Sequence, residues 1–219
     1  MNYAFEQNLL IPVAGVQLNA KLILPTGANA IILFAHGSGS NRLSPRNKMV
    51  ADYLVQQGFG TLLFDLLTPA EDEVYINRFD IILLSLRLVR ATEWLEYQLE
   101  KSYALGYFGA STGAAAALTA AAALQQIGAV VCRGGRPDLA MDILPEVHAA
   151  TLFIVGSLDT HVLQLNQQAL VKLNGNKKLE IVSGASHLFE EPYAIEQVCA
   201  TTASWFESYL LQPIRSHHF

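Results

Sequence analysis

Short runs that are apolar at every position alternate with longer segments of helical periodicity. This alternation limits the possible folds more than any other feature of the sequence. Continuous rather than alternating hydrophobicity is typical of strands covered by helices on both faces, as in a parallel sheet. We therefore predict a doubly wound, mostly parallel α/β sheet with right-handed crossovers and flanking helices. The predicted strands are residues 30–35, 60–65, 104–108, 129–132, 151–155 and 179–182.

The segments between these runs carry the helices and one hairpin. Residues 8–13 and 16–24 alternate in polarity around a short turn, which predicts an N-terminal antiparallel hairpin at the sheet edge. Gly58, Gly128 and Gly175 each follow a predicted helix, where a left-handed residue often ends the helix. The predicted helices are residues 44–57, 79–99, 112–126, 162–173 and 193–211.

Composition supports one large folded domain, residues 1–219, rather than a disordered chain. Hydrophobic residues make up 52% of the chain and charged residues only 15%, against about 25% charged in ordinary globular proteins. The 14 basic and 19 acidic residues give a net charge of −5. No run of Lys or Arg offers the basic footprint that a nucleic acid needs, so we expect no nucleic-acid partner.

The sequence also predicts a cytoplasmic protein without a membrane partner. The most apolar stretch, residues 114–124, is shorter than the roughly 20 residues that span a bilayer. Residues 1–10 lack the basic segment and apolar run of a signal peptide. Cys132 and Cys199 have no C-x-x-C spacing, which favours buried free thiols in a reducing compartment. Nothing in the sequence specifies an oligomeric state.

Ligands of such sheets bind beyond the carboxyl ends of the strands, so the chemistry is expected in the loops that follow them. One of these loops holds Gly109-Ala110-Ser111-Thr112-Gly113, a G-x-S-x-G motif between a predicted strand and a predicted helix. A nucleophile elbow requires that context, because small flanking residues let the chain turn sharply and present the serine hydroxyl. We therefore predict Ser111 as a nucleophile; the alternative is an ordinary helix-capping serine.

A serine hydroxyl needs a base to remove its proton, and six histidines are candidates. His187 lies just past the last predicted strand, on the same sheet edge as Ser111, and we predict it as the base. Its alternative role is that of a loop histidine that caps the final helix. Of the other five, His36 lies beside glycines, His148 at the opposite edge of the sheet, and His161 beside the expected acid. His217 and His218 lie in the C-terminal tail.

The imidazole in turn needs an acid that fixes its tautomer and stabilises its cation. Asp159 follows the penultimate central strand and therefore also lies at the carboxyl edge of the sheet. The chain order Ser111, Asp159, His187 is that of the α/β-hydrolases. Three rival acids follow other strands: Asp65, Asp138 and Asp142.

The tetrahedral intermediate of this chemistry carries an oxyanion, which needs N–H donors held in place. We predict the backbone N–H of Thr112, directly after the nucleophile, as one donor. The second is expected from the small-residue loop that follows residues 30–35, with Ser38 as first choice and Gly39 as second. A phosphate-binding loop is the alternative here, but the segment lacks the lysine of a P-loop and the G-x-G-x-x-G spacing.

These motifs together resemble the α/β-hydrolase superfamily and, within it, the dienelactone hydrolase-like branch. The resemblance runs from the His36-Gly37 loop through residues 109–113 and 156–162 to residues 184–192. It implies the α/β-hydrolase fold and a catalytic triad. Dienelactone hydrolases proper carry a cysteine at the elbow, whereas Ser111 makes this chain look more like a general serine esterase. We expect neither a metal nor another cofactor.

Many α/β-hydrolases insert a helical cap after the strand that corresponds to residues 129–132. Only residues 133–150 intervene here before the next strand. That length is too short for a cap domain, so we expect an open active site shaped by short loops.

Three residues are candidates for substrate contact at the site edge. Arg133 and Arg136 lie on the loop after residues 129–132, where a guanidinium is suited to clamp a substrate carboxylate. Their alternative is a structural ion pair with Asp138 or Glu190. His36 is the third candidate.

The residues therefore predict a serine esterase-type hydrolase (EC 3.1.1 class) that cleaves a small-molecule ester, thioester or lactone through an acyl-enzyme on Ser111. Acyl transfer to another acceptor, or perhydrolysis, uses the same triad and is a second hypothesis. A non-catalytic binding protein on the same fold is the third. Such proteins usually lack a triad member, and this chain retains all three.

Overall fold

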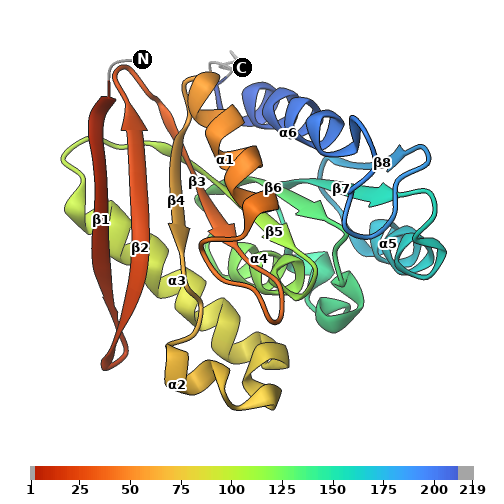
Figure 1. The fold of residues 1–219 in the computed structure, drawn as a ribbon, viewed down its shortest axis with the longest axis horizontal. Coiled ribbons are helices and arrows are strands. Elements are labelled where there is room, and N and C mark those ends of the chain that lie inside the picture. The colour runs from red at the N-terminus through yellow and green to blue at the C-terminus, as the bar shows by residue number, and fades with distance from the viewer. Residues whose placement is uncertain (1–2, 212–219) are drawn as a thin grey trace, which may run out of the picture.

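One sheet is built from all the predicted strands (Figure 1). Most of their ends shift by at most two residues, but the first strand begins at Tyr3 and not at residue 8. The structure, a computed structural model, describes residues 3–211. The strands are β1 (Tyr3–Val13), β2 (Val16–Pro25), β3 (Ala30–Ala35), β4 (Gly60–Phe64), β5 (Ala104–Ala110), β6 (Ile127–Arg133), β7 (Ala150–Gly156) and β8 (Lys177–Val182). Every residue of β3, β4 and β7 is buried, as their continuous hydrophobicity predicts.

The strand order is β1-β2-β4-β3-β5-β6-β7-β8. β1 and β2 pair antiparallel around a turn at Ala14 and Gly15, and β2 runs antiparallel to β4. All the neighbours from β4 to β8 are parallel to one another. The mostly parallel sheet and its N-terminal hairpin are therefore confirmed, and the carboxyl ends of the parallel strands meet at one edge.

Long helices cover both faces of this sheet (Figure 1). On one face lie α1 (Pro45–Gln56) and α6 (Ala194–Leu210), and on the other α3 (Ile81–Gln98), α4 (Thr112–Ala123) and α5 (Thr160–Lys172). Successive residues of β3 point to opposite faces, so Phe34 packs in the first core and Leu33 in the second. In the described part of the chain, no helix is both long and apolar enough to cross a bilayer.

The sequence pattern does not reveal the short helix α2 (Pro69–Asp72), because four residues are too few to show a helical period. A capping box holds it: the Thr68 hydroxyl accepts from the Glu71 N–H, and the Glu71 carboxylate accepts from the Thr68 N–H. The loop after β6 holds only the 3₁₀ turns Pro137–Ala140 and Leu144–Glu146. As predicted, this loop carries no cap domain.

The expectation for glycines at helix ends is right at one position and wrong at two. Gly58, just after α1, has a φ of 88°. Gly128 lies inside β6, and neither it nor Gly175 has a positive φ. The helices α4 and α5 end earlier than predicted, and the chain leaves them through the extended residues Leu124 and Leu173. An extended backbone is open to any residue, so no glycine is needed there.

Candidate active site

Ser111 stands on a sharp turn between β5 and α4, at the carboxyl edge of the sheet. Its φ of 52° and ψ of −120° are strained for a residue with a Cβ atom. The turn closes because its neighbours are small: a Cβ on Gly109 would lie 2.6 Å from the Ala114 Cα. The Ser111 N–H donates to the Arg133 carbonyl (3.2 Å), and the Ser111 carbonyl accepts from the Arg136 N–H (3.0 Å). These two bonds hold the elbow in place.

His187 and Asp159 meet beside this turn. Asp159 is the N-cap residue of α5, but its side chain makes no capping hydrogen bond. Instead its Oδ2 lies 2.6 Å from Nδ1 of His187, which comes from the loop after β8. A carboxylate at Nδ1 fixes the tautomer whose Nε2 accepts a proton. The Asp159 side chain is 14% exposed and that of His187 is 40%, so the acid is shielded while the base reaches the surface.

Ser111 and His187 line one cavity of about 210 Å³, which we call the Ser111 cavity. Within the described residues, no hydrogen bond joins the Ser111 Oγ to the His187 ring. Such bonds are often long in enzymes without substrate and tighten when it binds. The structure thus brings the predicted nucleophile, base and acid to one place. The cavity is lined by Gly37, Ser38, Ser40, Ser44, Arg46, Asn47, Ala110, Ser111, Arg133, His187 and Leu188.

The loop after β3 lies against the elbow, where an oxyanion hole is expected. A Cβ on Gly37 would lie 3.0 Å from the Ser111 Cβ, so the two backbones are close. The Ser38 N–H donates to Oγ1 of Thr112 at 2.8 Å, so this candidate donor is already engaged. Gly39 has a φ of 67° and is not among the residues that line the cavity. The Thr112 N–H and the choice of second donor stay predictions.

The rival acids and histidines lie elsewhere. Asp65 accepts from the Arg42 backbone N–H (2.8 Å) and from its guanidinium (2.6 Å). Three further candidates are exposed: Asp142, His148 and His161. Two lie outside the described residues: His217 and His218. Within residues 3–211, no group of three or more His, Cys, Asp or Glu side chains is arranged to hold a metal ion.

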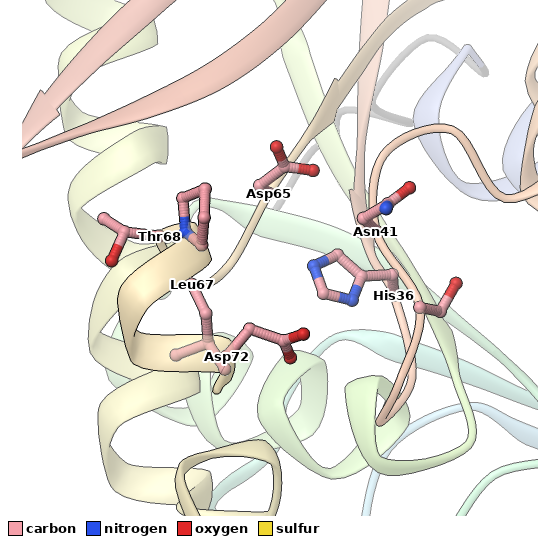
Figure 2. A pocket seen from close by; sticks show the side chains of 8 residues that line it. His36, Asn41, Asp65, Leu67, Thr68 and Asp72 are labelled. Atoms are coloured by element: carbon pink, nitrogen blue, oxygen red, sulfur yellow. The ribbon is translucent and has the colours of Figure 1, made fainter. Parts of the chain in front are cut away.

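His36 is buried beside a second cavity, of about 240 Å³, and does not line the Ser111 cavity (Figure 2). Its Nε2 accepts the Leu66 N–H at 2.9 Å, and its Nδ1 lies 3.1 Å from the Gly37 carbonyl oxygen. Burial lowers the pKa of His36, which keeps the ring neutral with its proton on Nδ1. His36 therefore ties the loop after β3 to the end of β4.

Arg136 and Arg133 differ in their partners. Arg136 forms a bidentate ion pair with Asp138, with both N–O distances 2.8 Å. Its contacts are therefore those of a structural ion pair and not of a clamp for a substrate carboxylate. Arg133 lines the Ser111 cavity, is 8% exposed and has no acidic partner within the described residues. Burial lowers the pKa of Arg133 to about 10, so the guanidinium stays charged at neutral pH. Arg46 also lines this cavity and is not a candidate that the sequence singles out.

The hairpin-edged parallel sheet, with an elbow at its carboxyl edge, is the α/β-hydrolase fold. The sequence model of the dienelactone hydrolase family matches residues 18–210, and the chain belongs to that family. A crystal structure of dienelactone hydrolase from Anabaena variabilis is 50% identical, covers 94% of this chain and 98% of its own, and has a TM-score of 0.89. Est1E from Butyrivibrio proteoclasticus shares the fold at 15% identity, covering 92% of this chain and 98% of its own, with a TM-score of 0.79.

Two curated relatives come from strains of Mycobacterium tuberculosis, and each is named "Putative phosphoribosyl transferase". Each is 52% identical to this chain over 205 residues. The match covers 93% of this chain but only 45% of each relative, so the chain spans less than half of their length.

Proposed function

We propose that this protein is a serine esterase-type hydrolase that cleaves small carboxylic esters, thioesters or lactones. The arrangement around one cavity carries the proposal: Ser111 stands on a strained elbow, and His187 beside it contacts Asp159 at 2.6 Å. Membership of the dienelactone hydrolase family supports hydrolysis as the reaction class.

In the proposed reaction, the Ser111 Oγ attacks the carbonyl carbon of the substrate while Nε2 of His187 removes its proton. Asp159 orients the ring and stabilises its cation. The oxyanion accepts hydrogen bonds from the Thr112 N–H, at the positive amino end of α4, and from the loop after β3. His187 then gives the proton to the leaving alcohol or thiol. A water molecule, activated in the same way, releases the acid from Ser111.

A fluorophosphonate probe tests the proposal, because it reacts covalently with an activated serine. We expect the wild-type protein to gain a single probe, on the peptide that holds Ser111, and the Ser111→Ala variant to gain none. Mass spectrometry of the digested protein measures both results. Folded wild-type protein that takes up no probe would contradict the proposal.

Asp159→Asn is expected to lower kcat by about 10⁴-fold, because the amide favours the wrong tautomer of His187 and carries no negative charge. Asp65→Asn is the matched control, since Asp65 is paired with Arg42 and does not contact His187. Its kcat is expected to stay within about tenfold of the wild-type value, a change worth at most about 1.4 kcal/mol. Steady-state kinetics with a p-nitrophenyl ester compare the two variants. A larger loss in Asp65→Asn would mean that the acid is wrongly assigned.

A further inference from the structure

The guanidinium of Arg133 is buried, and no acidic side chain among the described residues pairs with it. It lies at the carboxyl end of β6, and only one of its nitrogens, Nη2, has a hydrogen-bond partner within the described residues. That partner is Oδ1 of Asn47, at a long 3.4 Å. The Phe189 ring centre lies 5.9 Å from the guanidinium carbon, a contact that brings no negative charge. A buried charge without an anionic partner is unfavourable, so its presence calls for an explanation.

A second guanidinium lines the same cavity. Arg46 is the second residue of α1, and its Nε is also buried without a partner. Among the described residues, its acidic partner is Glu190 at 3.4 Å, and the Glu190 side chain is 66% exposed, so this pair is long and well solvated. Burial and, after it, repulsion from Arg46 lower the pKa of Arg133.

The remaining polar groups of the Ser111 cavity also suit an anion. The amino end of α1, a helix of 12 residues capped by Ser44, contributes Ser44, Arg46 and Asn47 to the lining of the cavity. Ser38, Ser40 and Ser44 are among the residues that line it, and no Asp or Glu of the described residues does. A helix N-terminus, hydroxyl donors and guanidinium groups together form a recurring environment for phosphate oxygens.

We propose that the Ser111 cavity holds the phosphate group of a phosphorylated ester, with Arg133 and Arg46 as its counter-charges, while Ser111 attacks the ester carbonyl nearby. The inference rests on the proposed function, because it concerns the substrate of the same site. A phosphate monoester carries close to two negative charges and three acceptor oxygens at neutral pH. Two guanidinium groups and a helix N-terminus match that charge, whereas one carboxylate would neutralise only one of the two arginines.

Binding of inorganic phosphate tests the cavity without using the hydrolytic activity. We expect phosphate to raise the melting temperature of the wild-type protein and to have little effect on Arg133→Met or Arg46→Met. Arg90→Met is the control, because Arg90 pairs with Glu93 on the exposed face of α3, and it should respond like wild type. A shift that survives both substitutions indicates an adventitious ion only, and no shift in the wild type also overturns the proposal.

Three matched p-nitrophenyl esters test the substrate class. Their acyl groups are 3-phosphonopropanoate, succinate and pentanoate, which carry a phosphonate, a carboxylate and no charge. We expect kcat/KM to be highest for the phosphonate when it is doubly ionised. Arg133→Met should lower that value by about 30- to 100-fold, the effect of losing a desolvated charge pair, and should lower the value for the uncharged ester by a clearly smaller factor. Arg46 is more exposed, so Arg46→Met should cost about tenfold.

The outcomes separate the two proposals. If no ester is cleaved and the fluorophosphonate probe does not react, the proposed function fails, and the phosphate measurement still decides on the cavity. If the esters are cleaved but the carboxylate is preferred to the phosphonate, or Arg133→Met slows all three equally, the phosphate assignment is overturned. Arg133→Met should fold, because it removes an unpartnered charge. If the Arg133→Met variant does not fold, Arg46→Met tests the phosphate assignment in its place.

Discussion

Ser111→Ala is expected to lower kcat for a small p-nitrophenyl ester by about 10⁶-fold while leaving the protein folded. The variant removes the only atom that forms the acyl-enzyme in the proposed reaction. Alanine keeps the Cβ atom and therefore the backbone conformation of the elbow, with its hydrogen bonds to Arg133 and Arg136. Initial rates and a melting curve for the same preparation test both halves of the expectation.

His187→Ala makes this test sharper, because nucleophile and base act as one unit. The double variant of Ser111 and His187 should lose no more activity than either single variant, since the second change removes nothing that still functions. Ser208→Ala, on an exposed part of α6, is the matched control and should keep wild-type activity. Additive losses, or a Ser111→Ala variant within tenfold of wild type, would show that hydrolysis proceeds by another route.

Gly113→Ala is expected to destabilise the protein by more than about 3 kcal/mol. A Cβ at this position would overlap the backbone carbonyl oxygens of Ala35 and His36, and backbone atoms cannot rotate away as a flexible side chain does. A change from glycine to alanine inside a helix normally raises stability by about 1 kcal/mol. The steric penalty at Gly113 therefore has to exceed this gain in helix propensity. For a chain of this size, the melting temperature should fall by at least about 6 °C.

Gly27→Ala separates crowding from backbone strain. Gly27 has a φ of 83°, but a Cβ there would meet no atom within 4 Å. Its substitution should therefore lower the free energy of unfolding only by the cost of a positive φ at alanine, about 1–2 kcal/mol. Circular dichroism melts of the two variants give the comparison. Equal losses in both would show that α4 does not depend on close approach to β3 at Gly113.

The sheet and the elbow could be predicted because their signals are local. The strand β3 is apolar at every position, which marks a strand buried on both faces. The glycines around Ser111 are demanded by the turn itself. Asp159 and His187 could be placed because both follow a predicted strand, and the carboxyl ends of parallel strands share one edge.

The roles of His36 and Arg46 could not be predicted in this way, because both depend on tertiary neighbours. The hydrogen bond from Leu66 to His36 exists because β3 and β4 are adjacent in the sheet. In the sequence, Arg46 looks like any charged residue in the first turn of a helix. Only the packing of α1 against α6 and β4 brings its side chain to the cavity that Arg133 lines.

Arg133 holds the elbow through its main chain and faces the cavity through its side chain. Its carbonyl oxygen accepts the Ser111 N–H, and every amino acid supplies that oxygen equally. Its guanidinium, in contrast, is specific to arginine. A substitution at position 133 can therefore change the charge at the cavity while keeping the main-chain hydrogen bond that holds Ser111. The two properties are separable by a single codon change, which makes position 133 a natural starting point for redirecting the proposed substrate preference.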